Sequence, residues 1–142
     1  MRFAKVLWGG LAVVLSSSNG CASISATSDR AGEVLICDGT FQQSSMFGHS
    51  SAQRRILLYP DPDPTKIRLK TFGQVEGVCI DHEGATCKTS LKGKTLVVSS
   101  TFPGWMGTQT FSFDAGTAHM TFGLGGLDGG QGFSGTCRRK DQ

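Results

Sequence analysis

The chain has 142 residues and nearly balanced charge, with 14 lysines and arginines against 11 aspartates and glutamates. That length is enough for one domain with a modest core and too short for two. The formal net charge is only +3. Nucleic-acid binding calls for a strongly basic domain with a clustered patch of cations, so we expect no nucleic-acid partner.

Residues 1–20 have the pattern of an export signal. Arg2 and Lys5 precede the apolar run of residues 6–15, and small and polar residues lead from it to Cys21. An apolar run of about 10 residues is half of what a transmembrane helix needs, so we expect a cleaved signal. Its removal takes away two cations and leaves 12 basic against 11 acidic residues, so the mature chain is close to neutral.

The dipeptide Gly20-Cys21 resembles the lipobox of bacterial lipoproteins, in which a small residue precedes a cysteine that becomes diacylated and N-terminal. The resemblance implies lipidation of Cys21 and a stable anchor in the membrane. Since Ala22 rather than aspartate follows, it also implies transfer to the outer membrane. The alternative is a simple secretory signal cut after Ser23 or Ala26, which discards Cys21 and yields a secreted soluble protein.

The rest of the chain has the composition of a tether followed by one β domain. Residues 21–32 are rich in small and polar side chains, as a lipidated, flexible tether would be. Over residues 33–140, short apolar runs are separated by glycine and proline, and no window has the 3.6-residue period of an amphipathic helix. We expect an all-β fold, a single antiparallel small barrel or sandwich with about seven or eight short strands.

Alternation of apolar and polar residues predicts the strands in chain order. They are expected over residues 34–41, 54–59, 66–70, 74–80, 86–90, 95–99, 108–113, 118–122 and 132–138. Asp38-Gly39 is expected to bulge or bend the first strand. Pro60, Pro62 and Pro64 cannot donate ladder hydrogen bonds, so their segment is expected to be a stiff loop.

The clearest hairpin folds about the turn residues Asp114-Ala115-Gly116-Thr117. Folding there predicts that Phe113 lies opposite Ala118 and that Phe111 lies opposite Met120 on one buried face. The glycine-rich residues 124–132 are expected to be a mobile hairpin loop. They lack the helix and the terminal lysine of a phosphate-binding loop.

Four cysteines remain for folding if Cys21 is lipidated or removed. An even number in an exported chain predicts disulfides, for which three connectivities exist. We favour Cys79–Cys87, which are close in sequence, and Cys37–Cys137, which would tie the first strand of the domain to the last. Closing a loop of about 100 residues stabilises a fold by roughly 4.7 kcal/mol in the loop-entropy description.

Ionisable side chains do not form a recognisable catalytic or metal motif. Asp81-His82-Glu83 lies inside the small cysteine loop, where consecutive residues cannot all converge on one point, so we interpret it as solvated. His49 and His119 are isolated in sequence, and nothing in the spacing supports a zinc site formed with His82. We therefore expect no catalytic, metal-binding or cofactor-binding residue.

Four residues are candidates for an interaction surface. Lys66, Arg68 and Lys70 alternate with apolar residues and could bind an anionic lipid or glycan or an acidic protein. The alternative is that these cations guard a strand against edge-to-edge association. Trp105 lies in an expected loop, either as an exposed anchor for a partner or as a plug at one end of the barrel.

Two family resemblances bear on function. Cys37-Asp38-Gly39 at the start of the domain and Ser134-Gly135-Thr136-Cys137 at its end resemble small exported proteobacterial proteins of unknown function. That resemblance implies the terminal disulfide and no activity. The format also resembles lipoprotein inhibitors of lysozyme, but their serine-glycine-x-x-tyrosine motif is absent. Because the single tyrosine, Tyr59, lies in a different setting before Pro60, no inhibitory residue is carried over.

These features together predict a non-catalytic binding or envelope-associated module, exported and located at the outer membrane or in the periplasm. An inhibitor of a hydrolase, either lysozyme or a protease, is the first alternative. An enzyme with an unrecognised site is the second.

Overall fold

The structure, a computed structural model, describes residues 33–104, 107–126 and 129–141. The predicted export signal, Cys21 with its tether, and Trp105 lie outside the described residues. Within the described ranges, no helix has the length and hydropathy needed to cross a membrane.

Nine strands and one short 3-10 helix make up the described chain. They are β1 (Leu35–Ser45), β2 (Gly48–Tyr59), η2 (Pro64–Lys66), β3 (Arg68–Thr71), β4 (Gln74–Gly77), β5 (Thr86–Lys92), β6 (Thr95–Thr101), β7 (Thr108–Asp114), β8 (His119–Gly126) and β9 (Gly129–Arg139). The all-β prediction is therefore confirmed. Each of the nine predicted ranges overlaps one observed strand, so the approximate total of seven or eight strands was too low.

All nine strands belong to one antiparallel sheet in the order β4-β3-β2-β1-β9-β8-β7-β6-β5. The first and last strands are neighbours at its centre. On one side of this pair β2, β3 and β4 follow in sequence, and on the other side β8, β7, β6 and β5 follow in reverse order. The sheet thus consists of two meanders joined through β1 and β9.

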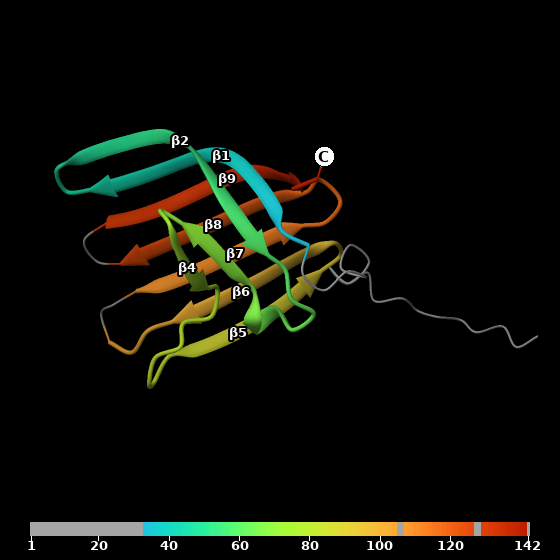
Figure 1. Cartoon of the computed structure of the whole chain (residues 1–142). Coiled ribbons are helices and arrows are strands. Elements are labelled where there is room, and N and C mark those ends of the chain that lie inside the picture. Colours follow the sequence, from blue (N-terminus) through green and yellow to red (C-terminus); the bar gives the residue numbers. More distant parts are fainter. Residues whose placement is uncertain (1–32, 105–106, 127–128, 142) are drawn as a thin grey trace, which may run out of the picture.

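The sheet curls into a half-barrel, and its core lies inside the curl. Figure 1 shows β2 passing with β3 and β4 across the face formed by the strands from β9 to β5. Buried side chains from both parts meet there, namely Ile56, Leu58, Ile67, Leu69 and Val78 with Leu96, Val98, Phe111, Phe113, Met120 and Phe133. The predicted alternation in residues 66–70 is confirmed, because Ile67 and Leu69 are both buried.

Close approach of β1 and β9 depends on a disulfide and on two glycines. Cys37 and Cys137 lie directly opposite each other and are bonded. Gly39 lies opposite Gly135. A Cβ atom added to Gly135 would stand 2.6 Å from the carbonyl oxygen of Asp38, so no larger residue fits there. Of the two distortions expected at Asp38-Gly39, a bulge or a bend, the bulge does not occur, because β1 stays in register with β9 through these residues.

The connection from β4 to β5 crosses from one edge of the sheet to the other over the core. The Nε2 of Gln109, a residue only 8% exposed, donates 3.0 Å hydrogen bonds to the carbonyl oxygens of Gly77 and Val78. The backbone N–H of Ile80 donates to Oγ of Ser100 at 3.0 Å. These bonds satisfy backbone groups that the crossing segment would otherwise bury without partners.

The second disulfide, Cys79–Cys87, fastens the same connection to the start of β5. Both predicted disulfide pairings are thus confirmed.

The hairpin of β7 and β8 has a different register from the predicted one. Phe113 pairs with Met120 and Phe111 with Phe122. The turn has the expected four residues but lies one position later, over residues 115–118, and Ala118 at its end takes a left-handed conformation with φ of 52°. The partner of Phe113 is thus two residues later in β8 than predicted. Because side chains alternate between faces every residue, a shift of two keeps Phe111, Phe113 and Met120 on the predicted core face.

The predicted loop over residues 124–132 is mostly strand. β8 continues to Gly126 and β9 begins at Gly129. The glycines pair across the two strands instead of forming a long loop.

We predict that Gln109→Leu lowers the free energy of unfolding by about 1–3 kcal/mol, because the buried carbonyl group of Val78 and the part-buried one of Gly77 each lose a donor. Urea unfolding measures the loss. Gln53→Leu is the matched control, since the amide of Gln53 bonds to Thr40 on an exposed surface, and its effect should stay within about 0.5 kcal/mol. Equal losses in the two variants would contradict the role assigned to Gln109.

Candidate functional site

The face of the sheet turned away from the core, here called the outer face, carries a row of hydroxyl side chains. Cross-strand register places Thr40, Ser134, Thr121 and Ser112 side by side on β1, β9, β8 and β7. They bond within the protein. The hydroxyl oxygens of Ser112 and Thr121 are 2.6 Å apart, and Nε2 of His119 lies 3.0 Å from Oγ of Ser134. Most hydrogen-bonding side chains in this part of the outer face therefore already have partners within the protein.

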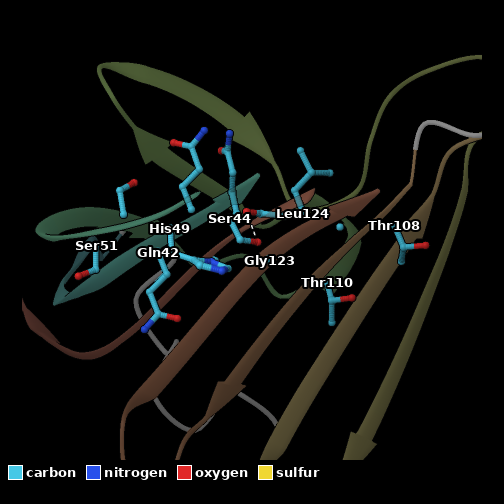
Figure 2. A pocket seen from close by; sticks show the side chains of 14 residues that line it. Gln42, Ser44, His49, Ser51, Thr108, Thr110, Gly123 and Leu124 are labelled. Carbon is cyan, nitrogen blue, oxygen red and sulfur yellow. Dashed lines mark hydrogen bonds between the residues drawn. The ribbon is translucent and has the colours of Figure 1, made fainter. Parts of the chain in front are cut away.

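Nearer the β1–β2 and β8–β9 turns, the outer face is hollowed into a groove of about 810 Å³. Its floor consists of Gly123 and Gly125 of β8 and Gly130 and Gly132 of β9. Its walls carry Gln42, Ser44, His49 and Ser51 on one side and Thr108 and Thr110 on the other. Figure 2 shows Gln42, Ser51 and Thr110 on this side of the sheet, with Leu124 on the opposite side.

Three of the four floor glycines are not required by the fold. A Cβ atom on Gly123 or Gly132 would come no closer than 3.6 Å to the protein, and one on Gly125 would meet nothing within 4 Å, whereas one on Gly130 would stand 3.3 Å from the carbonyl oxygen of Leu124. None of the four floor glycines has a positive φ. Glycine inside a strand costs about 0.5–1 kcal/mol relative to alanine. Glycine in such a position often marks the close approach of a ligand or of another backbone.

The polar side chains of the groove walls have few partners within the protein. Among the described residues, no hydrogen bond is formed by the side chains of Gln42, His49, Ser51, Thr108 and Thr110. Ser44 makes one 3.5 Å contact with the carbonyl oxygen of Gly130. The groove thus presents hydrogen-bond donors and acceptors without protein partners, whereas the hydroxyl groups in the row beside it are bonded within the protein.

The groove is also free of fixed charge. The described residues that line it include no lysine, arginine, aspartate or glutamate, and His49 is their single titratable side chain. The lining is therefore suited to holding a neutral polar ligand.

The candidate cations of the sequence lie outside the groove. Lys66 is 3.9 Å from the carboxylate of Asp63, and the guanidinium of Arg68 lies 5.8 Å from the ring centroid of Tyr59. Lys70 is half-buried, opposite Leu57 on β2. A role for these three cations in binding stays a prediction.

The histidines are dispersed. His49 is on β2, His119 is on β8, and His82 is in the β4–β5 connection, where its Nδ1 lies 2.9 Å from the carbonyl oxygen of Glu83. Within the part of the chain that the structure describes, no three histidine, cysteine or carboxylate side chains are grouped as metal ligands. Asp81 and Glu83 are both exposed.

Asp38 supplies the main ion pair of the outer face. Its carboxylate accepts a 2.7 Å hydrogen bond from Nε of Arg55, and a nitrogen of Arg138 lies 3.8 Å away. The hydrogen bond from Arg55, with the charges of both arginines, holds the pKa of Asp38 below its usual range, despite an opposing effect of burial. The carboxylate is therefore favoured in the folded protein.

No protein-family model, curated protein or solved structure matches the chain. The groove is accordingly interpreted from its own geometry. Sequence reasoning missed it, although the alternation Gly123-x-Gly125 and Gly130-x-Gly132 is a usable signal. Glycines two residues apart on a strand lie on one face and leave a bare strip there.

We predict opposite stability effects for two glycine substitutions. Gly39→Ala should lower the free energy of unfolding by about 1–3 kcal/mol, because its Cβ would meet the backbone of β9. Gly132→Ala should be neutral or stabilising by up to about 1 kcal/mol. Denaturant unfolding of both variants provides the comparison. A destabilised Gly132→Ala protein would show that the fold itself needs this glycine.

We also predict that stability declines as the pH falls through the acidic range. Since the folded pKa of Asp38 is depressed, its stabilising effect is complete above the unfolded pKa and is lost as the pH falls through the folded pKa. Urea midpoints at neutral pH and near pH 3 measure the decline. Asp38→Asn and Arg55→Gln should each make it shallower, and an unchanged decline in both variants would contradict this linkage.

Proposed function

We propose that the chain is an exported, non-catalytic binding module whose ligand lies in the groove on the outer face. One observation carries the proposal: polar walls with few partners inside the protein stand over a glycine floor, and the fold does not require three of its four glycines. Glycines inside strands make the sheet less stable than alanines would, and the space that they leave open could hold a ligand. Polar groups in such a site fix a ligand's orientation.

The disulfides support an envelope location, and the direction of β1 leaves the groove accessible in a protein anchored at Cys21. Two disulfides are stable in an oxidising compartment. Leu35 begins β1 at the end of the sheet where Arg139 ends β9, whereas the groove walls at Gln42 and Ser44 are near the other end of β1. A lipid anchor at Cys21 would therefore attach at the end away from the groove, about 25–30 Å along the strand.

Inhibition of a hydrolase is a second candidate function, and the β1–β2 turn favours it. Met46 is 79% exposed and Phe47 is 93% exposed at the tip of this hairpin. A projecting apolar turn has the shape needed to enter the cleft of another protein. Phe47→Ser should abolish inhibition of a susceptible lysozyme or protease and leave ligand binding in the groove unchanged.

Site-specific crosslinking tests the binding proposal. A photo-crosslinking amino acid at Thr110, on the groove wall, should capture an envelope component, and adding Gly132→Val should abolish capture by filling the floor. The same amino acid at Thr136, exposed on the outer face beyond the groove, is the control and should capture nothing. Capture at Thr110 that survives Gly132→Val, or equal capture at Thr136, would contradict the proposal.

A further inference from the structure

The chemistry of the groove restricts the ligand that it would take. The walls offer one amide, one imidazole and several hydroxyl groups, all of which both donate and accept hydrogen bonds when neutral. An amide presents its donor and its acceptor in one plane, which suits a pair of neighbouring hydroxyl groups. Such walls match a ligand that is itself rich in hydroxyl groups.

Charged ligands fit poorly. A phosphate or carboxylate chain is normally held by arginine or lysine, and the described lining contains neither. On the row of the outer face that passes through Gln42 and Thr110, the cation Lys88 lies on β5, two strands beyond Thr110. That distance is about 10 Å. An anionic ligand in the groove would therefore lack a direct countercharge.

Apolar peptides fit no better. The floor has no side chains that could form specificity pockets, and Leu124 points to the opposite side of the sheet. The floor instead consists of backbone and Cα atoms of Gly123 and Gly132, with no side chain of the described residues above them. A strip of C–H groups without side chains leaves room for the face of a sugar ring whose hydroxyl groups are equatorial.

The length of the groove suits several linked sugars. Its walls lie on β2 and β1 at one side and on β7 at the other, so a ligand that bridges them crosses β9 and β8. Four strand spacings correspond to about 19 Å. A chain laid across the strands would meet Gln42 and Ser51 near one end and Thr110 near the other.

We infer that the ligand of the groove is an uncharged glycan with flat, equatorially linked sugars, lying across the strands with ring faces on the glycine floor. This inference rests on the proposed function, since it names the ligand class of the same groove. It differs from the anionic partners suggested by the cationic residues around β3, which lie elsewhere on the molecule.

Titration calorimetry of the full exported chain with defined tetrasaccharides tests the inference. Cellotetraose and the tetramer of N-acetylglucosamine are the flat neutral probes, and tetragalacturonate is the charged one. A neutral probe should bind, with an affinity that changes less than twofold between low and high salt, because no ion pair is involved. Tetragalacturonate should bind at least tenfold more weakly.

Substitutions locate the binding. Gly132→Val should weaken it more than tenfold, and Gln42→Ala should weaken it about fivefold, the effect of losing one typical hydrogen bond. Gln53→Ala is the matched control, because Gln53 is an exposed glutamine on the same face outside the groove lining. It should leave the affinity unchanged.

Three outcomes would overturn the inference. Tighter, salt-sensitive binding of tetragalacturonate would assign a charged ligand. Binding of a neutral probe that Gly132→Val leaves intact would place the sugar outside the groove. If no tetrasaccharide binds while crosslinking at Thr110 still depends on Gly132, the groove is a binding site for another class of ligand. In that last case the glycan inference fails and the proposed function stands.

Discussion

Pairing of β1 with β9 is the constraint on which the rest of the fold depends. It joins the two ends of the domain, from Leu35 with Arg139 to Ser45 with Gly129. Without it, no pair of hydrogen-bonded strands would join the meander of β1 to β4 with the meander of β5 to β9, and only the packed core and the crossing segment after β4 would connect them. The Cys37–Cys137 bond holds the pairing in register, and Gly39 and Gly135 let the two backbones approach. The groove lies on the same pair of strands, toward their other end, so its floor and one wall are positioned by the central contact of the sheet.

The outer face shows how one surface can serve two purposes. In its middle rows, neighbouring hydroxyl groups and His119 bond to one another, which adds cross-strand contacts to the backbone ladder. Toward the β1–β2 turn, similar residue types stand on either side of glycines and are too far apart to bond across the gap. In the groove, glycines occupy the places on β8 and β9 that hydroxyl residues occupy in the middle rows. Within the described chain, the polar residues on either side of them therefore have no side-chain partner across the sheet. These glycines cost sheet stability, which the buried core and the two disulfides offset.

Sequence patterns predicted those parts of the fold in which burial imposes alternation, and missed those in which it does not. Ile67 and Leu69 alternate with cations and were correctly assigned to the core, and the even cysteine count led to both disulfides. Residues 42–53 and 123–132 are largely polar or glycine-rich and have no run of alternating apolar residues, so alternation gave no sign that β1, β2, β8 and β9 continue through them. The register of β7 and β8 depends on the backbone conformation of Ala118, which no periodicity records. The groove was missed for the same reason as the strands that build it.

The place where the chain enters the domain also determines how the fold would respond to tension. Val34 and Lys140 are hydrogen-bonded at the same end of the sheet, and the groove lies toward the opposite end of β1. Pulling between a tether before Glu33 and a ligand in the groove would act along β1. The backbone hydrogen bonds to β2 and β9 would then resist in shear, many at once, instead of opening one after another. The covalent link at Cys37 would pass part of the force directly to β9. A module anchored at one end and holding a polymer at the other would thus be extended along its most strongly connected strand.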